Sequence, residues 1–272
     1  MIRAPAVAGY FYPASKESIE STLAEFDVSG VVAEPAMGVV APHAGYRYSG
    51  PVAAKVYASI KAAESVILLG PNHGAGRGFE PPPKAAIMTE GEWEFPTGVV
   101  PIDEELAASL VAESPLLSVD PYAHEAEHSL EVQVPFLQRF AGKIKIVPII
   151  ISHLSDPEVM ELAEGIFRGI KKVGKAVTLV ASSDFSHYVP HEVAKRQDSK
   201  AIKMIEALDA EGLLKVVREE RISMCGYQPT AIVIEVCKKM GAKEGILVDY
   251  KTSGDTSGDY STVVGYGGLI IR

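Results

Sequence analysis

The sequence predicts an α/β protein with a mixed, mostly parallel central sheet and helices on both of its faces. Short runs of β-branched residues alternate with longer stretches of helical period along the whole chain, which is typical of a sheet whose strands are joined by helices. Several of the short runs are continuously apolar, as residues 66–69 are, and such strands are usually covered on both faces. The last two runs follow each other without a helix, so we expect an antiparallel pair at one edge of the sheet.

The predicted strands, in order, are residues 38–41, 65–69, 85–89, 144–151, 176–181, 245–250 and 262–271. The helices are expected to begin at start signals, such as Ser15 or the pair Asp156 and Pro157, because a capping side chain and a proline in the first turn both favour a helix start. They are predicted at residues 16–26, 51–63, 103–113, 127–140, 158–172, 191–208, 210–219 and 230–240. No linker or repeat interrupts the alternation, so the sequence predicts a single domain over residues 1–272.

The composition argues against several functional classes. The 272 residues are 47% hydrophobic and 22% charged and carry a net charge of -9, which is typical of a globular chain. An acidic surface without a basic stripe repels phosphate, so we expect no nucleic-acid partner. No apolar run approaches the roughly 20 residues that cross a bilayer, and the first residues do not resemble a signal peptide. With only Cys225 and Cys237 as cysteines, we expect a cytoplasmic location and no membrane partner.

Three predicted strands are each followed within a few residues by a histidine. These histidines are His43, His73 and His187. Ligands of open α/β sheets bind beyond the carboxyl ends of the strands, so parallel strands would bring the three imidazoles to one rim. A single loop histidine most often has no ligand, but three in the same topological position indicate a binding site.

Cys225 lies just before a predicted helix that has Pro229 in its first turn. Unpaired amide groups at a helix N-terminus stabilise a thiolate, which favours a nucleophile or a metal ligand. A buried small apolar residue is an equally open alternative. Cys237, by contrast, recurs at helical spacing with Val233 and Met240 and is expected in the core.

The cluster Glu127, His128 and Glu131 falls within one turn of a predicted helix, so its side chains can face the same way. We interpret them as supporting or acid–base groups around the pocket. The alternative is the solvated start of a helix with acids near its N-terminus, which fits His124 and Glu125 better. Pro135 must kink this helix or move its regular part downstream.

The segment 253–259 connects the last two predicted strands. Most segments of this kind are turns, but its length and its acids leave room for Asp255 to reach the pocket and bind a ligand. His153 and His191 we interpret as structural or surface residues.

With these residues, the chain resembles the Memo family (mediator of cell motility). The matching stretches follow one another almost from end to end: RAPAVAGYFYP at 3–13, APHAGYRYSG at 41–50, GPNHG at 70–74, EHSLE at 127–131, SSDFSH at 182–187, CGYQPT at 225–230 and SGDTSGDYSTVVGYG at 253–267. The resemblance implies a fold similar to class III extradiol ring-cleavage dioxygenases, which hold non-haem Fe(II) with two His and one Glu. It also implies that His43 and His73 are the two early pocket histidines, and that Asp184, His187 and Cys225 complete the pocket.

The resemblance further implies a link to copper or iron, and the binding of a phosphotyrosine peptide of a receptor in animals. The first hypothesis is therefore a non-haem, metal-dependent oxidoreductase that is dioxygenase-like and acts on a small molecule. Imidazoles with a soft thiolate suit iron or copper and would also hold zinc. We expect His43, His73 and Cys225 to bind the metal, with His187 as a further ligand or general acid–base that Asp184 orients.

Two alternatives remain open. A non-enzymatic module would use the same pocket to bind a peptide or small ligand, with Arg47 meeting a carboxylate or phosphate. The aromatic residues that would line its cleft, unless they only pack in the core, are Tyr10, Tyr12, Tyr46 and Tyr48. A hydrolase would use Cys225 as nucleophile, His187 as base and Asp184 to orient the base. No oxyanion-hole signature accompanies that thiol.

Overall fold

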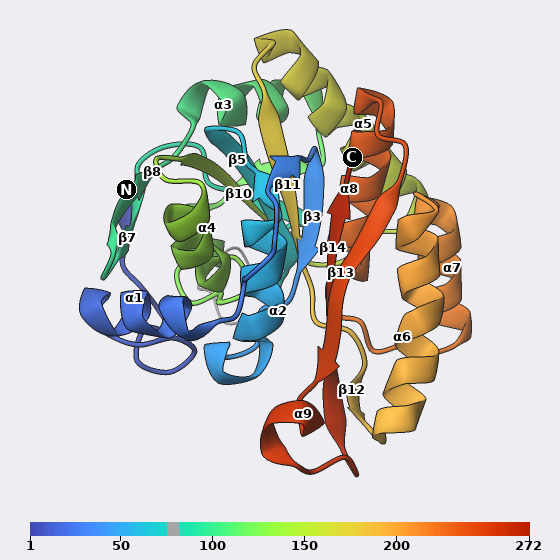
Figure 1. Cartoon of the computed structure of the whole chain (residues 1–272). Coiled ribbons are helices and arrows are strands. Elements are labelled where there is room, and N and C mark those ends of the chain that lie inside the picture. Colours follow the sequence, from blue (N-terminus) through green and yellow to red (C-terminus); the bar gives the residue numbers. More distant parts are fainter. Residues whose placement is uncertain (75–81) are drawn as a thin grey trace.

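The central sheet has the mixed architecture that the alternating pattern predicts. The computed structural model describes residues 1–74 and 82–272. Within them, nine strands form one sheet in the order β12-β14-β3-β11-β5-β10-β6-β9, with β13 paired to β14 (Figure 1). These strands are β3 (Gly38–Ala41), β5 (Ser65–Pro71), β6 (Ala85–Ile87), β9 (Leu117–Val119), β10 (Lys145–Ile151), β11 (Val177–Ser182), β12 (His187–Val189), β13 (Gly245–Thr252) and β14 (Val263–Ile271).

The four strands at the centre of the sheet, β3, β11, β5 and β10, are parallel to one another. Their carboxyl ends therefore meet at one edge of the sheet. β14 is antiparallel to β3, and β13 is antiparallel to β14, as the closeness of the last two strands in the sequence predicts. All residues of β3, β5 and β11 are buried, which agrees with their continuously apolar sequences.

Helices cover both faces of the sheet (Figure 1). One face carries α1 (Lys16–Glu25), α2 (Tyr46–Ala58) and α4 (Val134–Phe140). The other carries α5 (Asp156–Val173), α6 (His191–Glu206), α7 (Ala210–Glu219) and α8 (Tyr227–Met240), and α3 (Glu104–Glu113) packs on α5. The predicted fold class is therefore confirmed. Within the described part of the chain, no helix combines the length and apolarity that a membrane crossing requires.

α5 starts at the pair Asp156 and Pro157, where the sequence predicts a helix start. Ser155 and Glu158 form a reciprocal capping box, and Pro157 occupies the first turn, where its missing N–H costs nothing. Gly174 ends the helix with a φ of 73°, a conformation that glycine adopts without the steric cost of a Cβ.

Two of the predicted helices differ most from the sequence prediction. α2 begins at Tyr46 and contains Pro51, because its first turn is held from outside by a hydrogen bond from the Tyr46 amide to the Phe11 carbonyl (2.8 Å). The helix predicted over residues 127–140 is regular only in α4, where Pro135 takes a position in the first turn. Upstream of α4, short 3₁₀ turns at Pro121–His124 and Glu131–Gln133 flank an irregular segment.

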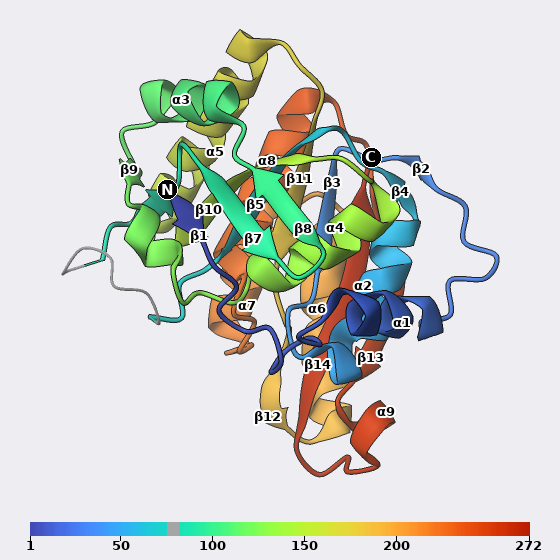
Figure 2. The same ribbon diagram turned by 90° about the vertical axis from the view of Figure 1, so that its left-hand side faces the viewer.

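A small second sheet was not predicted from the sequence. It consists of β1 (Ile2–Arg3), β7 (Glu92–Phe95) and β8 (Gly98–Pro101). Figure 2 shows β7 and β8 in front of the central sheet, in the same view that faces α1, α2 and α4. β2 (Glu34–Pro35) pairs with β4 (Ile60–Lys61), and the four-residue α9 (Gly254–Ser257) lies in the connection between β13 and β14.

Candidate metal centre

Two of the predicted histidines meet at the carboxyl edge of the parallel strands. His43 follows β3, and His73 follows β5, with β11 between these two strands. Their ring centroids are 5.3 Å apart, in an edge-on arrangement. The parallel register of the sheet therefore brings together two side chains that are 30 positions apart in the sequence.

The third imidazole of the cluster belongs to His128. Its ring centroid lies 5.5 Å from that of His43 and 4.5 Å from that of His73. One ring nitrogen from each of the three residues lies within 4.8 Å of the others, so the group could hold a metal ion. From the sequence, His128 is expected on a helix and in a supporting role. In the structure residues 127–130 are irregular, and this backbone turns the ring toward His43 and His73.

Glu127 holds two of these imidazoles. Its Oε1 accepts a hydrogen bond from Nδ1 of His73 (2.9 Å), and its Oε2 accepts one from the His73 amide (2.7 Å). Nδ1 of His128 lies 3.4 Å from the same Oε1. Because a carboxylate can only accept, Nδ1 of His73 carries a proton and Nε2 remains available as a ligand. Although burial opposes it, the bond to Glu127 raises the pKa of His73.

His43 is buried and is held at three points. Its amide donates to Oδ1 of Asp184 (2.8 Å), Nδ1 lies 2.9 Å from Oγ of Ser182, and Nε2 lies 3.3 Å from Sγ of Cys225. Burial, reinforced by the neighbouring imidazoles, keeps the pKa of His43 well below its usual value. His43 is therefore a neutral imidazole, the form that binds metals.

Cys225 and Asp184 are both adjacent to His43, and burial raises the pKa of each of these two side chains. Burial, with a further contribution from Asp184, raises the pKa of the Cys225 thiol, so burial outweighs the helix N-terminus that was expected to favour the thiolate. Burial also raises the pKa of Asp184 to about 6. The Cys225 thiol donates a hydrogen bond to the carbonyl oxygen of Asp184 (3.6 Å), and its Sγ also lies 3.3 Å from Nε2 of His43.

His187 lies near this group but outside the three-imidazole cluster. It is on β12, where its Nδ1 is 2.8 Å from the carbonyl oxygen of Ser223 and its amide donates to Oγ of Ser223. The Ser223 carbonyl thus orients the ring, a role that the sequence predicts for Asp184. The imidazole within 3.3 Å of the Cys225 thiol is that of His43, whereas the hydrolase hypothesis names His187 as the base.

The other two predicted binding residues, Tyr46 and Asp255, make contacts within the core and within a turn. Tyr46 is buried, its hydroxyl donates to the Val132 carbonyl (2.8 Å), and its ring packs on Phe136. Asp255 accepts hydrogen bonds from the amide of Thr252 and the hydroxyl of Tyr260, which stabilise the turn before β14. The interpretation of these residues as packing and turn residues therefore fits their contacts.

Glu131 does not face the imidazoles but anchors the N-terminal segment. Its side chain is fully buried and pairs with Arg3 at 2.7 Å. It also accepts hydrogen bonds from the amides of Ala6 and Val7 and from the hydroxyl of Tyr12. This segment places the ring of Phe11 4.6 Å from that of His128. Glu131 therefore holds one wall of the site in place.

His124 was expected at the solvated start of a helix, and this expectation is wrong. Its side chain is fully buried, and its ring centroid lies 6.0 Å from that of Trp93. Burial, together with the nearby Arg3, lowers the pKa of His124 to about 3. His124 is a neutral core residue.

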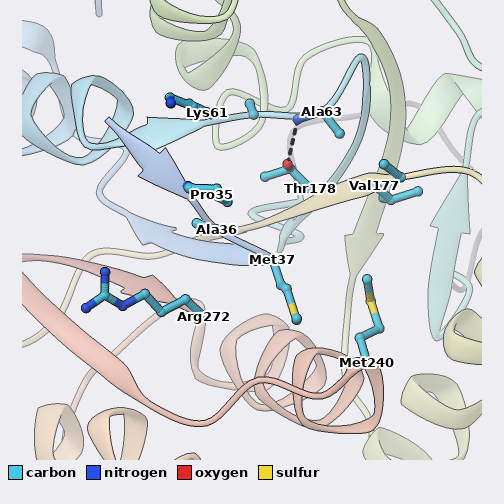
Figure 3. A pocket seen from close by; sticks show the side chains of 11 residues that line it. Pro35, Ala36, Met37, Lys61, Ala63, Val177, Thr178, Met240 and Arg272 are labelled. Carbon is cyan, nitrogen blue, oxygen red and sulfur yellow. Dashed lines mark hydrogen bonds between the residues drawn. The ribbon is translucent and has the colours of Figure 1, made fainter. Parts of the chain in front are cut away.

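The opposite end of the sheet offers a cavity without such chemistry (Figure 3). It has a volume of about 370 Å³, lies where β11 begins, and contains no His, Cys, Asp or Glu in its lining. The hydrogen bond from the Ala63 amide to the hydroxyl of Thr178 crosses its lining (Figure 3). The chemistry-bearing side chains thus concentrate at the carboxyl edge.

Glu127 is expected to make stability sensitive to acid. Burial would raise its pKa, but the hydrogen bonds from His73 and from backbone amides outweigh burial and lower the pKa from 4.5 to about 2. A depressed carboxylate pKa stabilises the fold above the unfolded-state pKa, and this contribution is lost as the pH falls from about 4.5 toward 2. Denaturant titrations at a series of pH values should show this loss in the wild type and a flatter pH profile in Glu127→Gln. Identical profiles would contradict this reading.

The fold and the site together define an α/β protein that carries three clustered histidines at the carboxyl edge of a mixed sheet. A family model described as "Memo-like protein" matches residues 3–270. The chain belongs to the Memo family.

Similar proteins match over nearly their whole length. A MEMO1 family protein of Methanopyrus kandleri is 43% identical, covering 100% of this chain and 99% of that protein. A MEMO1 family protein of Sulfurisphaera tokodaii is 44% identical, covering 98% of each. The crystal structure of an uncharacterized protein from Escherichia coli K12 has a TM-score of 0.58 at 13% identity, over 86% of this chain and 99% of that one. That likeness concerns the fold alone.

Proposed function

We propose that the chain binds one transition-metal ion through His43, His73 and His128 and uses it for a redox reaction on a small molecule. The observation that carries the proposal is the approach of one nitrogen from each ring to within 4.8 Å of the others. It is supported by the acceptors on Nδ1 of His43 and His73, because metal-binding histidines usually donate their second ring N–H to a carboxylate, carbonyl or similar oxygen.

Iron and copper are the metals proposed, and the donor set would also accept zinc. Imidazole suits all three metals, and a nearby thiolate adds a soft ligand that favours Cu(I) or zinc. Sγ of Cys225 is 3.3 Å from Nε2 of His43, so it can join the same ion once it loses its proton. A bound iron or copper would supply one-electron and oxygen chemistry.

Two groups of this chain would handle protons next to the metal. Asp184 is buried, and its pKa of about 6 lets it gain and lose a proton near neutral pH. Nδ1 of His187 lies 2.8 Å from the Ser223 carbonyl oxygen, which can only accept, so Nδ1 is the donor of that ring and Nε2 faces away from this bond. We propose both as acid–base groups for the reaction of the bound small molecule.

A metal titration tests the proposal. Protein stripped with a chelator is titrated without oxygen with Fe(II), Cu(I) and Zn(II), each in competition with a chromophoric chelator. We expect saturation at one equivalent for at least one of them, and Cys225→Ala should weaken Cu(I) binding more than Fe(II) binding. Cys237→Ala, which removes a fully buried core thiol, is the matched control and should bind like the wild type. No saturable binding of any metal would exclude the proposed function.

The second candidate is a module that binds a peptide or small ligand without turning it over. Two exposed aromatic residues adjacent to site residues favour it: Tyr10 is 89% exposed and Tyr188 is 77% exposed. Tyr188 also has a φ of 58°, a strained conformation that is often retained at functional sites. Oxygen uptake by iron-loaded protein with a panel of catechols separates the two candidates, since turnover that His43→Ala abolishes would rule out binding alone.

A further inference from the structure

We propose that a buried chain of hydrogen bonds from Tyr57 through Gln133 to Ser182 fixes the tautomer of His43, with the proton on Nδ1 and the lone pair on Nε2. These three side chains lie on α2, on the 3₁₀ turn before α4 and at the end of β11. None of them was identified as a site residue from the sequence. The link to metal binding rests on the proposed function, whereas the tautomer itself is a property of the metal-free protein.

The orientation of the Gln133 amide follows from its neighbours. One end of the amide faces the carbonyl oxygens of Pro42 (3.0 Å) and Ala41 (3.4 Å). Carbonyls only accept hydrogen bonds, so this end must be the NH₂ group. The other end is therefore Oε1, to which the hydroxyl of Tyr57 donates at 2.8 Å. Both Gln133 and Tyr57 are almost fully buried, so water does not compete for these bonds.

Ser182 has one proton and three polar neighbours. The Gln133 NH₂ group donates to Oγ of Ser182 at 2.8 Å, and Oγ lies 2.6 Å from the carbonyl oxygen of Ser129. The carbonyl cannot donate and the NH₂ group cannot accept, so the hydroxyl proton of Ser182 must point to Ser129. Oγ then has only a lone pair left for its third neighbour, Nδ1 of His43, at 2.9 Å.

Nδ1 of His43 must therefore be a donor. Neutral imidazole in water prefers the proton on Nε2. The chain of hydrogen bonds from Tyr57 to Ser182, which we call the relay, therefore selects the tautomer that is less favoured in solution. The selected form directs the Nε2 lone pair to the side of the ring where Sγ of Cys225 lies, 3.3 Å away. Ser182, Gln133 and Tyr57 are accordingly positioning residues, which act on a metal only through His43.

Nitrogen-15 NMR of the metal-free protein tests the tautomer directly. In wild-type protein labelled at histidine, His43 should show a protonated Nδ1 and an unprotonated Nε2. In Ser182→Ala, where Nδ1 has no acceptor, the Nε2–H form should become populated. Ser182→Thr keeps the hydroxyl and should restore the wild-type pattern. A protonated Nε2 in the wild type, or an unchanged Nδ1–H form in Ser182→Ala, would overturn the proposal.

Zn(II) affinity provides the second readout. We expect Ser182→Ala to weaken Zn(II) binding about 10- to 100-fold, the usual effect of removing an outer partner of a metal-binding histidine. Tyr57→Phe should weaken it less, because it only loosens Gln133. Ser65→Ala is the matched control, since it removes a buried serine hydroxyl at the other end of the sheet, where Oγ bonds Asp103.

The two readouts separate the possible failures. If the wild type binds no Zn(II) but has the Nδ1–H tautomer, the relay stands and the proposed function fails. If Ser65→Ala and Ser182→Ala weaken Zn(II) binding equally, the loss reflects general stability, and the positioning role of Ser182 is refuted.

Discussion

Replacing Glu131 with alanine is expected to lower the free energy of unfolding by about 3–5 kcal/mol, because it leaves the charge of Arg3 buried without its partner. The two side chains are 2% and 0% exposed and lie 2.7 Å apart. The substitution also removes the acceptor for the amides of Ala6 and Val7 and for the hydroxyl of Tyr12. Unsatisfied buried donors add to the cost.

Chemical denaturation measures this effect. Trp93 is the only tryptophan, and the guanidinium of Arg3 lies 4.2 Å from the centroid of its ring, so its fluorescence also reports release of the N-terminal segment. Glu113→Ala is the control. Glu113 pairs with Arg168 and Lys172 at the surface, and such exposed pairs contribute about 0–1 kcal/mol. Equal losses in the two variants would show that Glu131 is not the anchor described here.

Replacing His128 with alanine is expected to weaken metal binding by about 100-fold or more. Structural zinc sites bind with about 10–16 kcal/mol shared among four ligands, so one ligand contributes about 3 kcal/mol. A competition titration with Zn(II) measures the change. His153→Ala serves as the control, because His153 is exposed and follows β10 at the same edge of the sheet.

His187→Ala distinguishes the structure-based ligand set from the one expected from the sequence. His187 lies outside the three-imidazole cluster, and its Nδ1 is bonded to Ser223. We therefore expect His187→Ala to retain most of the Zn(II) affinity. A loss as large as that of His128→Ala would mean that His187 replaces or joins His128 as a ligand.

The fold was largely predictable because its strands carry strong local signals. β3 and β5 are fully buried, and their apolar runs end at Pro42 and near Pro71. The small sheet was missed because Glu92–Phe95 alternates in burial and Gly98–Pro101 is mostly exposed, so neither segment looks like a core strand. The predicted start of α2 is too late in the sequence, because Pro51 is normally a first-turn residue. Only the contact with Phe11 reveals that the helix starts at Tyr46.

The site was predictable only where the topology of the sheet determines it. His43 and His73 follow parallel strands, so the rule for carboxyl ends identified them. His128 follows no strand, and its orientation depends on an irregular segment held by Glu127. The relay from Tyr57 to Ser182 could not be predicted from the sequence for another reason. Ser182 lies two positions before Asp184 in a recognisable motif. Gln133 and Tyr57 are ordinary residue types, and their roles depend on three-dimensional hydrogen-bond partners.

The X-ray absorption spectrum of the Zn(II)-loaded protein tests the central claim most directly, because it counts the ligands of the bound ion. Three imidazole nitrogens at about 2.0–2.1 Å are predicted for the wild type, and two for His128→Ala loaded at high protein concentration. A wild-type spectrum with fewer than three imidazole ligands, or one that His128→Ala leaves unchanged, would contradict a metal centre formed by His43, His73 and His128.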